Sequence, residues 1–150
     1  IDADGNPSVI EFNCRFGDPE TQPILQRLQS DLVSHCQSAL ERRLDTAVAQ
    51  WDPRPAVGVV LAAGGYPNAY EKGHTITGLD TPWPATTKVF HAGTQTQDGN
   101  IVTHGGRVLC VSALGNTIEE AIQLAYAGVD HIHWQDMIFR QDIGWRAIDR

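Results

Sequence analysis

Two prolines within five residues divide this chain into two parts of different character. The segment Trp51-Asp52-Pro53-Arg54-Pro55 restricts the backbone at successive positions, so it predicts a stiff connector and not a helix or a central strand. Before it, leucines recur at helical spacing. After it, short apolar runs alternate with Gly-rich turns. The sequence therefore predicts a structural boundary there, with one part at residues 1–50 and a second at residues 56–150.

The start of the first part alternates in the manner of a β-strand. A strand over Ser8–Phe16 would point successive side chains to opposite faces. One face would hold an apolar set suited to a core, made of Ile10, Phe12, Cys14 and Phe16. The other would hold Glu11, Asn13 and Arg15, which are two oxygen donors and a cation about 7 Å apart at each step.

Two helices are predicted between this strand and the connector, over residues 21–29 and 31–42. They share an apolar face at spacings of three and four, formed by Leu25, Leu28, Leu32, Cys36, Leu40 and Leu44. Either Asp18 or Thr21 is the predicted cap of the first helix. Pro19 suits a first helical position after Asp18, but Pro23 leaves the boundary open.

The second part combines strands with one well-marked helix. Apolar and β-branched runs predict strands over Val57–Ala63, Thr87–Ala92, Ile101–Thr103 and Arg107–Ala113. Thr117 followed by Glu120 is a capping box that opens a helix. Its apolar face is formed by Ile118, Ile122, Ala125 and Val129. The expected fold class is therefore α+β.

Composition argues against several partners. The chain has 11 Lys and Arg against 18 Asp and Glu, a net charge of −7, whereas a nucleic-acid-binding protein normally carries a basic excess. No apolar run approaches the roughly 20 residues of a membrane span, so neither nucleic acid nor a membrane is expected as a partner. Cys14, Cys36 and Cys110 are odd in number and far apart, which favours free thiols in a reducing cytoplasm.

The row of Glu11, Asn13 and Arg15 is the sharpest chemical feature. Magnesium prefers hard oxygen donors and is usually held by one or two protein side chains together with water and substrate phosphates. A guanidinium adds a permanent cation suited to carboxylate or phosphate. The spacing alone fits a magnesium site and also fits an exposed strand face without function, so it does not decide between the two.

A longer stretch of sequence resembles a known family. Residues 9–22, Val-Ile-Glu-Phe-Asn-Cys-Arg-Phe-Gly-Asp-Pro-Glu-Thr-Gln, resemble the signature of the phosphoribosylamine–glycine ligases, which are ATP-grasp enzymes of purine biosynthesis. Further segments resemble the carboxy-terminal region of that family in order and spacing: Gly65-Tyr66-Pro67, Tyr70, Lys72-Gly73, residues 89–94, residues 106–109, Ala125-Tyr126, Arg140 and Asp142-Ile143-Gly144. The resemblance covers essentially the whole chain.

The resemblance implies both a reaction and a division of roles. ATP would phosphorylate the glycine carboxylate, and the amine of 5-phosphoribosylamine would attack the acyl phosphate. Glu11 and Asn13 would hold Mg²⁺ or Mn²⁺ between the phosphates of ATP, and Arg15 would be catalytic, steadying the acyl phosphate or the glycine carboxylate. Residues 1–50 would be the end of an ATP-grasp domain, followed at 56–150 by a small mixed α/β carboxy-terminal domain.

The resemblance reaches only roughly the last third of a family member. The amino-terminal domain and most of the ATP-grasp domain would be the missing partners, and we expect this chain alone to be inactive. Another ATP-grasp carboxylate–amine ligase and a non-catalytic module of the same fold are the alternatives.

The roles of three single residues and one pair of histidines stay open. Asp18 is a cap or a substrate contact, Arg107 and Arg140 face a cleft or dock onto the missing domains, and the pair His131 and His133 packs a helix end or binds metal.

Overall fold

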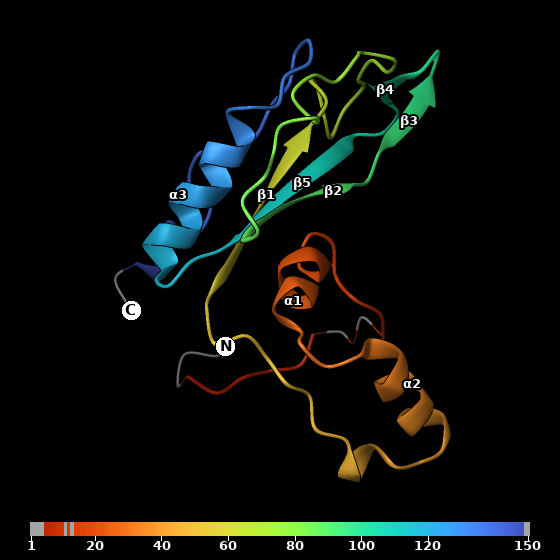
Figure 1. The fold of residues 1–150 in the computed structure, drawn as a ribbon, viewed down its shortest axis with the longest axis vertical. Coiled ribbons are helices and arrows are strands. Elements are labelled where there is room, and N and C mark those ends of the chain that lie inside the picture. The colour runs from red at the N-terminus through yellow and green to blue at the C-terminus, as the bar shows by residue number, and fades with distance from the viewer. Residues whose placement is uncertain (1–4, 11, 13, 149–150) are drawn as a thin grey trace.

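Strand β5 (Arg107–Leu114) forms the centre of the fold. The computed structural model describes residues 5–10, 12 and 14–148. Within them β5 pairs antiparallel with β1 (Ala56–Ala62) on one side and β2 (Thr87–His91) on the other, in the order β1-β5-β2 (Figure 1). Seven of the eight β5 residues are buried, as expected for an apolar central strand. The predicted strands at these three places are confirmed to within one or two residues.

Helix α3 (Ile118–Val129) covers one face of this sheet. Thr117 caps it, because its Oγ1 accepts from the Glu120 backbone N–H at 3.2 Å. Ala125 and Val129 are buried, and the more exposed Ile118 and Ile122 pack against the same core, so the predicted apolar face is confirmed. The main core lies between α3 and the sheet, with Val59, Leu61, Leu109 and Val111 fully buried there.

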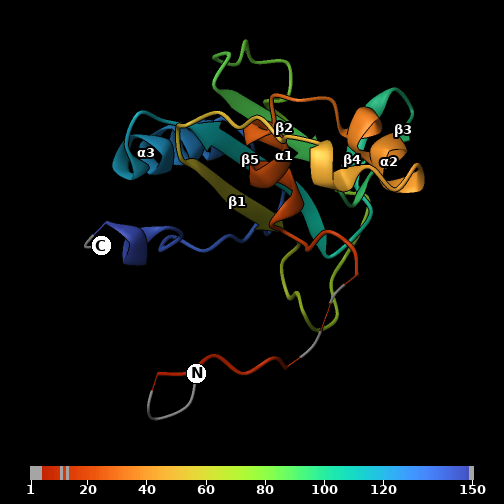
Figure 2. The same cartoon turned by 90° about the horizontal axis from the view of Figure 1, so that it is seen from below.

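Helix α1 (Thr21–Arg27) lies against the sheet from the other side (Figures 1 and 2). A Cβ added at Gly58 of β1 would lie 3.4 Å from the Pro23 ring, so the helix packs directly over this position of the strand. Gln26 Nε2 donates to the Thr86 carbonyl at 2.9 Å. The first part of the chain is therefore docked on the second through ordinary packing and at least one directed hydrogen bond.

A second, two-stranded sheet extends beyond the main one. It joins β3 (Thr94–Gln97) to β4 (Asn100–Thr103). The turn between them places Asp98 and Gly99 at positive φ, 50° and 81°, which is the conformation that a tight hairpin needs. Strand β4 was predicted. Strand β3 was not, because Thr-Gln-Thr-Gln lacks the apolar alternation of a half-buried strand.

The connector is held in place by ion pairing as well as by its prolines. Asp52 is buried, and Arg54 donates to its carboxylate at 2.7 and 2.9 Å. Arg27, at the end of α1, donates to the Asp52 carbonyl at 3.1 and 3.2 Å. The hydrogen bond from the Arg54 side chain lowers the pKa of Asp52 to about 2.

Helix α2 (Leu32–Leu40) and the short 3₁₀ helix η1 (Leu44–Thr46) stand apart from the sheet (Figure 1). The predicted helices at 21–29 and 31–42 are confirmed, but the predicted apolar face they share is wrong in its second half. Leu40 is 85% exposed, and Cys36 and Leu44 are also exposed. Helical spacing predicts which residues share a face, but not that another element covers that face.

The predicted strand over Ser8–Phe16 is not formed by the residues that the structure describes there. Ile10 is 95% exposed and Phe12 is 80% exposed, so the predicted core face is also wrong. A strand is stable only when its backbone groups pair with a neighbour, and no described strand lies beside this segment. Glu11 and Asn13 lie outside the described residues.

The start of α1 also differs from the prediction. The helix begins at Thr21 with Glu20 in the cap position, and Glu20 makes no side-chain cap hydrogen bond. Neither Asp18 nor Thr21 is the cap: the Asp18 carboxylate pairs with Arg107, and the Thr21 hydroxyl donates to the Gly17 carbonyl. A final 3₁₀ helix, η2 (Trp145–Ala147), closes the described chain. None of the described helices is both long and apolar enough to cross a bilayer.

Candidate functional site

Of the three residues that the sequence singled out for chemistry, the structure describes only Arg15. Its side chain is exposed, and its Nη1 donates to the Phe16 carbonyl at 3.1 Å. Glu11 and Asn13 lie outside the described residues, so the structure does not test whether the three side chains converge. Among the described residues, no group of three His, Cys, Asp or Glu could hold a metal ion. His131 contacts the Trp83 ring edge-on at 5.8 Å between ring centroids, which is a packing role.

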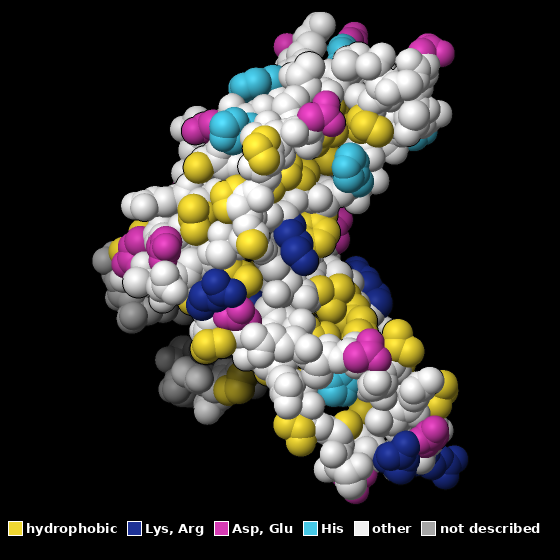
Figure 3. All heavy atoms as spheres, in the orientation of Figure 1, with side chains coloured by type: hydrophobic (Ala, Val, Ile, Leu, Met, Phe, Trp, Pro, Cys, Tyr) yellow, Lys and Arg dark blue, Asp and Glu magenta, His cyan; other side chains and the backbone are white. Residues whose placement is uncertain are grey.

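A hollow of about 590 Å³ lies where α1 leaves part of the sheet uncovered. Its size falls in the range of small-molecule sites. The floor is apolar and the rim carries Tyr66 and two arginines. The lining is formed by Pro19, Gly58, Val60, Ala62, Tyr66, Pro67, Arg107, Ile138, Phe139, Arg140 and Ile143. Figure 3 shows the molecule narrowing between its two parts, with Lys and Arg side chains near the waist.

A β-bulge turns Arg107 toward this hollow. Leu61 of β1 pairs with Leu109 of β5, but Ala62 pairs with Arg107, so Val108 is an extra residue in β5. Residues paired across a sheet share a face, and strict alternation would have placed Arg107 with Leu109, on the α3 side. The bulge instead places it with Ala62 on the opposite face. Bulges re-aim side chains in this way at many functional sites.

The Arg107 guanidinium contacts two residues that are distant in the sequence, Tyr66 and Asp18. Its Nε donates to Tyr66 Oη at 3.0 Å, and its Nη1 donates to the Asp18 carbonyl at 3.0 Å. The same Nη1 lies 3.1 Å from Asp18 Oδ2. The guanidinium carbon also lies 5.8 Å from the Tyr66 ring centroid. The hydrogen bond to Tyr66, followed by the charge of Asp18, raises the pKa of Arg107.

Arg140 forms the other charged part of the rim. It donates to the Asp142 carboxylate at 2.6 and 2.9 Å, and this pairing raises the pKa of Arg140 and lowers that of Asp142. Tyr126 of α3 fastens the same segment, because its hydroxyl donates to the Arg140 carbonyl at 2.7 Å and accepts from Ile143 N–H at 3.1 Å. Both arginines are permanently charged, so they can bind anions but do not transfer protons at neutral pH.

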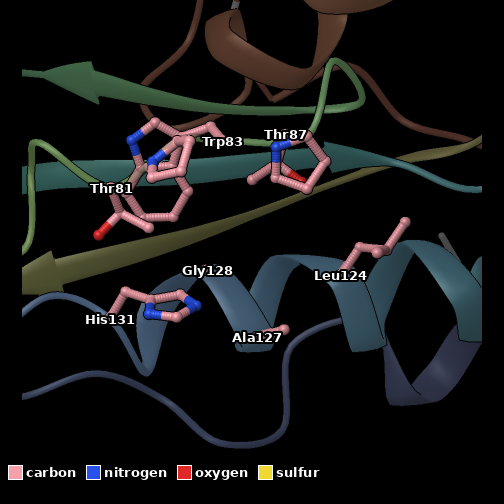
Figure 4. Close-up of a pocket in the computed structure, with 9 residues that line it drawn as sticks. Thr81, Trp83, Thr87, Leu124, Ala127, Gly128 and His131 are labelled. Atoms are coloured by element: carbon pink, nitrogen blue, oxygen red, sulfur yellow. The ribbon is translucent and has the colours of Figure 1, made fainter.

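A second, smaller space lies on the other side of the sheet, between α3 and the segment before β2. Figure 4 shows Trp83 and Thr87 facing Leu124, Gly128 and His131 across it. Its volume of about 70 Å³ is well below that of a cofactor site. It is a packing defect beside Gly128, where an added Cβ would meet Val111 at 2.7 Å.

The sequence alone does not decide whether Arg107 and Arg140 face a cleft or dock onto the missing domains, and in the structure both line the hollow. The contact of Asp18 and Tyr66 with Arg107 is not predictable from the sequence, because the three residues are far apart along the chain. No local signal marks the bulge, because Arg107-Val108-Leu109 reads as regular strand. Gly105 and Gly106 form a bend that leads into β5.

The elements and their topology define this chain as a small mixed α/β domain with a helical segment docked on its sheet. Residues 56–146 match the sequence model of the family described as phosphoribosylglycinamide synthetase, C domain. The chain belongs to this family, and the resemblance seen in the sequence is confirmed.

Relatives extend the match to the whole chain. A phosphoribosylamine–glycine ligase of Vibrio cholerae is 62% identical over 150 residues, which is 100% of this chain and 35% of the relative. One from Escherichia coli K12 is 58% identical over 151 residues, again 35% of its length. The crystal structure of a phosphoribosylamine–glycine ligase from Thermotoga maritima aligns with a TM-score of 0.72 and 38% identity, covering 93% of this chain and 34% of that one. The chain thus spans about a third of the relatives it matches.

Proposed function

We propose that this chain is the carboxy-terminal part of a phosphoribosylamine–glycine ligase. The complete enzyme would join glycine to 5-phosphoribosylamine at the expense of ATP, through an acyl phosphate, in purine biosynthesis. The single observation that supports this most strongly is the 62% identity to a relative of that name along the whole chain. Identity over both parts favours this ligase over another ATP-grasp ligase that shares only the metal-binding segment.

The two parts of the chain would belong to different domains of that enzyme. Residues 1–50 would complete an ATP-grasp domain, and residues 56–150 would form the carboxy-terminal domain. In support, the family match begins at residue 56, just after the connector. Exposed apolar side chains before the connector, Val9, Ile10, Phe12 and Phe16, are what a strand would present when its neighbours come from another region of the enzyme.

Glu11 and Asn13 would hold the divalent metal. A carboxylate and an amide are both hard oxygen donors, so the donor set fits Mg²⁺ or Mn²⁺. When bound, the metal would supply positive charge beside the phosphates of ATP. Arg15 would bind the acyl phosphate or the glycine carboxylate. In support, its side chain is exposed and its guanidinium donates to the adjacent Phe16 carbonyl, a contact that a bound anion would replace.

The remaining two-thirds of the enzyme would supply the other substrate contacts. ATP, glycine and 5-phosphoribosylamine would bind between this chain and the amino-terminal and ATP-grasp regions that we expect in the rest of the enzyme. For this reason we expect the 150-residue chain to produce no ADP from ATP, glycine and 5-phosphoribosylamine. Turnover by the isolated chain would contradict the proposal that the rest of the enzyme supplies essential substrate contacts.

A hybrid protein tests the proposal directly. This chain would replace the matching segment of the Escherichia coli relative, to which it is 58% identical. We expect the hybrid to form ADP only when both glycine and 5-phosphoribosylamine are present. A folded hybrid that binds ATP but shows no such dependence would contradict the proposed activity.

The metal assignment has its own test in the same hybrid. Glu11→Ala is expected to lower the rate by two or more orders of magnitude, as loss of a transition-state charge contact does, and to raise the magnesium concentration needed for half-maximal rate. Glu41→Ala removes an exposed carboxylate from the turn after α2 and is the matched control. An unchanged magnesium titration in Glu11→Ala would overturn the assignment.

A further inference from the structure

The contact between Arg107 and Asp18 joins the two parts of the chain at one point. Asp18 follows Arg15 by three residues and Asn13 by five. Five extended residues span at most about 17 Å, so whatever holds Asp18 also limits where the segment before it can lie. Arg107 belongs to β5, the most buried strand of the fold. The contact therefore ties the proposed metal-binding segment to the rigid core of the second part.

The geometry makes this contact more than a surface ion pair. A lone exposed pair contributes little, because two flexible side chains must be ordered to form it. Here Arg107 is already oriented by Tyr66, through the hydrogen bond at 3.0 Å and the ring below its guanidinium. It also binds the Asp18 backbone carbonyl at 3.0 Å in addition to the carboxylate. The main chain at residue 18 is thus held directly.

Arg140 differs from Arg107 in how far along the sequence its carboxylate partner lies. It lies on the same rim, but its carboxylate partner is Asp142, two residues away in the same segment. Such a local pair cannot restrain the first part of the chain. Arg107 therefore makes a long-range contact and Arg140 a short-range one, so Arg140 is a matched control for Arg107.

We propose that Arg107, aimed by the β5 bulge and oriented by Tyr66, is a positioning residue that holds Asp18 and thereby places the Glu11–Arg15 segment for metal binding. The effect on metal binding rests on the proposed function. The restraint that Arg107 places on the segment before Asp18 is independent of that function. Two measurements separate these claims.

The first measurement uses the 150-residue chain and needs no activity. Cys14 is exposed and directly follows Asn13, the second of the two proposed metal ligands. In a Cys36→Ser, Lys88→Cys background, nitroxide labels at Cys14 and at position 88 of β2 report the distance between the segment and the sheet, while Cys110 stays buried. We expect the distance distribution by pulsed electron spin resonance to broaden in Arg107→Gln. Asp18→Asn, which keeps the backbone carbonyl, should broaden it less, and Arg140→Gln should leave it unchanged.

The second measurement uses the hybrid enzyme. Arg107→Gln is expected to raise the magnesium concentration at half-maximal rate by roughly three- to tenfold, which corresponds to about 0.7–1.4 kcal/mol, with Arg107→Lys in between. A merely structural role would lower the melting temperature without moving the magnesium titration. Arg43→Gln, which breaks a short-range ion pair with Glu41, is the control.

The outcomes are distinguishable. An unchanged distance distribution in Arg107→Gln overturns the proposal, whatever the hybrid does. A broadened distribution with an unchanged magnesium titration in an active hybrid overturns the positioning role. If the unsubstituted hybrid is inactive, the proposed function fails, and the distance distribution alone decides whether Arg107 restrains the segment.

Discussion

The ring of Tyr66 occupies the space into which a side chain at Gly106 would project. An ideal Cβ built at Gly106 lies 2.2 Å from Tyr66 Cδ2 and 3.1 Å from the Tyr70 ring. Real side chains do not approach this closely, so the absence of a side chain at position 106 allows Tyr66 to lie beside Arg107. A glycine, a tyrosine and an arginine thus depend on one another at the edge of the hollow.

Gly106→Ala is therefore expected to displace the Tyr66 ring and break its hydrogen bond with Arg107. Overpacking of this kind costs about 1–3 kcal/mol, which urea denaturation measures. In a Tyr66→Ala background the same substitution should cost less, because the ring it strikes is gone. Equal costs in the two backgrounds would show that the steric contact does not decide the effect.

Two leucines provide a matched test of where the core lies. Leu109 is completely buried between the sheet and α3, whereas Leu40 at the end of α2 is 85% exposed. Leu109→Ala should lower the free energy of unfolding by about 2–5 kcal/mol. Leu40→Ala should change it by less than about 0.5 kcal/mol. A substantial loss at Leu40 in the isolated chain would mean that α2 is covered in solution.

The three thiols should differ sharply in reactivity. Burial raises the pKa of Cys110 to about 12, and Cys14 and Cys36 are exposed. Only the thiolate reacts readily, so Ellman's reagent at neutral pH should titrate two thiols rapidly in the folded chain. The third should react only in denaturant. Rapid reaction of all three in the folded chain would contradict the burial of Cys110.

The Asp52–Arg54 pair predicts a contribution to acid stability. The hydrogen bond from Arg54 lowers the pKa of Asp52 from 3.8 to about 2 in the folded chain. Because the folded pKa is the lower one, the stabilisation is complete above about pH 4 and is lost as the pH falls toward 2. Asp52→Asn should therefore lower the melting temperature at neutral pH by several degrees, and the difference from the unsubstituted chain should shrink below pH 4.

Asp142→Asn is the control for this pH dependence. Asp142 also pairs with an arginine, but that pair is much more exposed, and water screens it. Its loss should change the melting temperature less at every pH. If the two variants behaved alike, burial of Asp52 would not be the reason for its effect.

Much of the second part of the chain was predictable because its signals are local. β1 and β5 are apolar runs of strand length, and α3 opens with its own cap at Thr117. Each of these elements is specified by residues within about ten positions of one another. The family resemblance was equally readable, since it depends on residue identities and not on contacts.

The first part was predicted less well because its signals depend on partners. The alternation over Ser8–Phe16 describes a strand, but a strand forms only beside another, and the described residues provide none there. The exposed Leu40 shows the same limit for a helix. Glu11 and Asn13, the proposed metal ligands, remain predictions from the sequence.

The amino-acid sequence by itself determined the helices α1, α2 and α3, the strands β1, β2, β4 and β5, the stiff connector at residues 51–55 and membership of the family. Tertiary structure alone decided which face Arg107 occupies and that Asp18 binds it instead of capping α1. The physical reason is that side chains alternate along a strand with a period of two, so one extra residue reverses the face. Whether Val108 is that extra residue depends on how β5 pairs with β1, a relationship between segments more than forty positions apart.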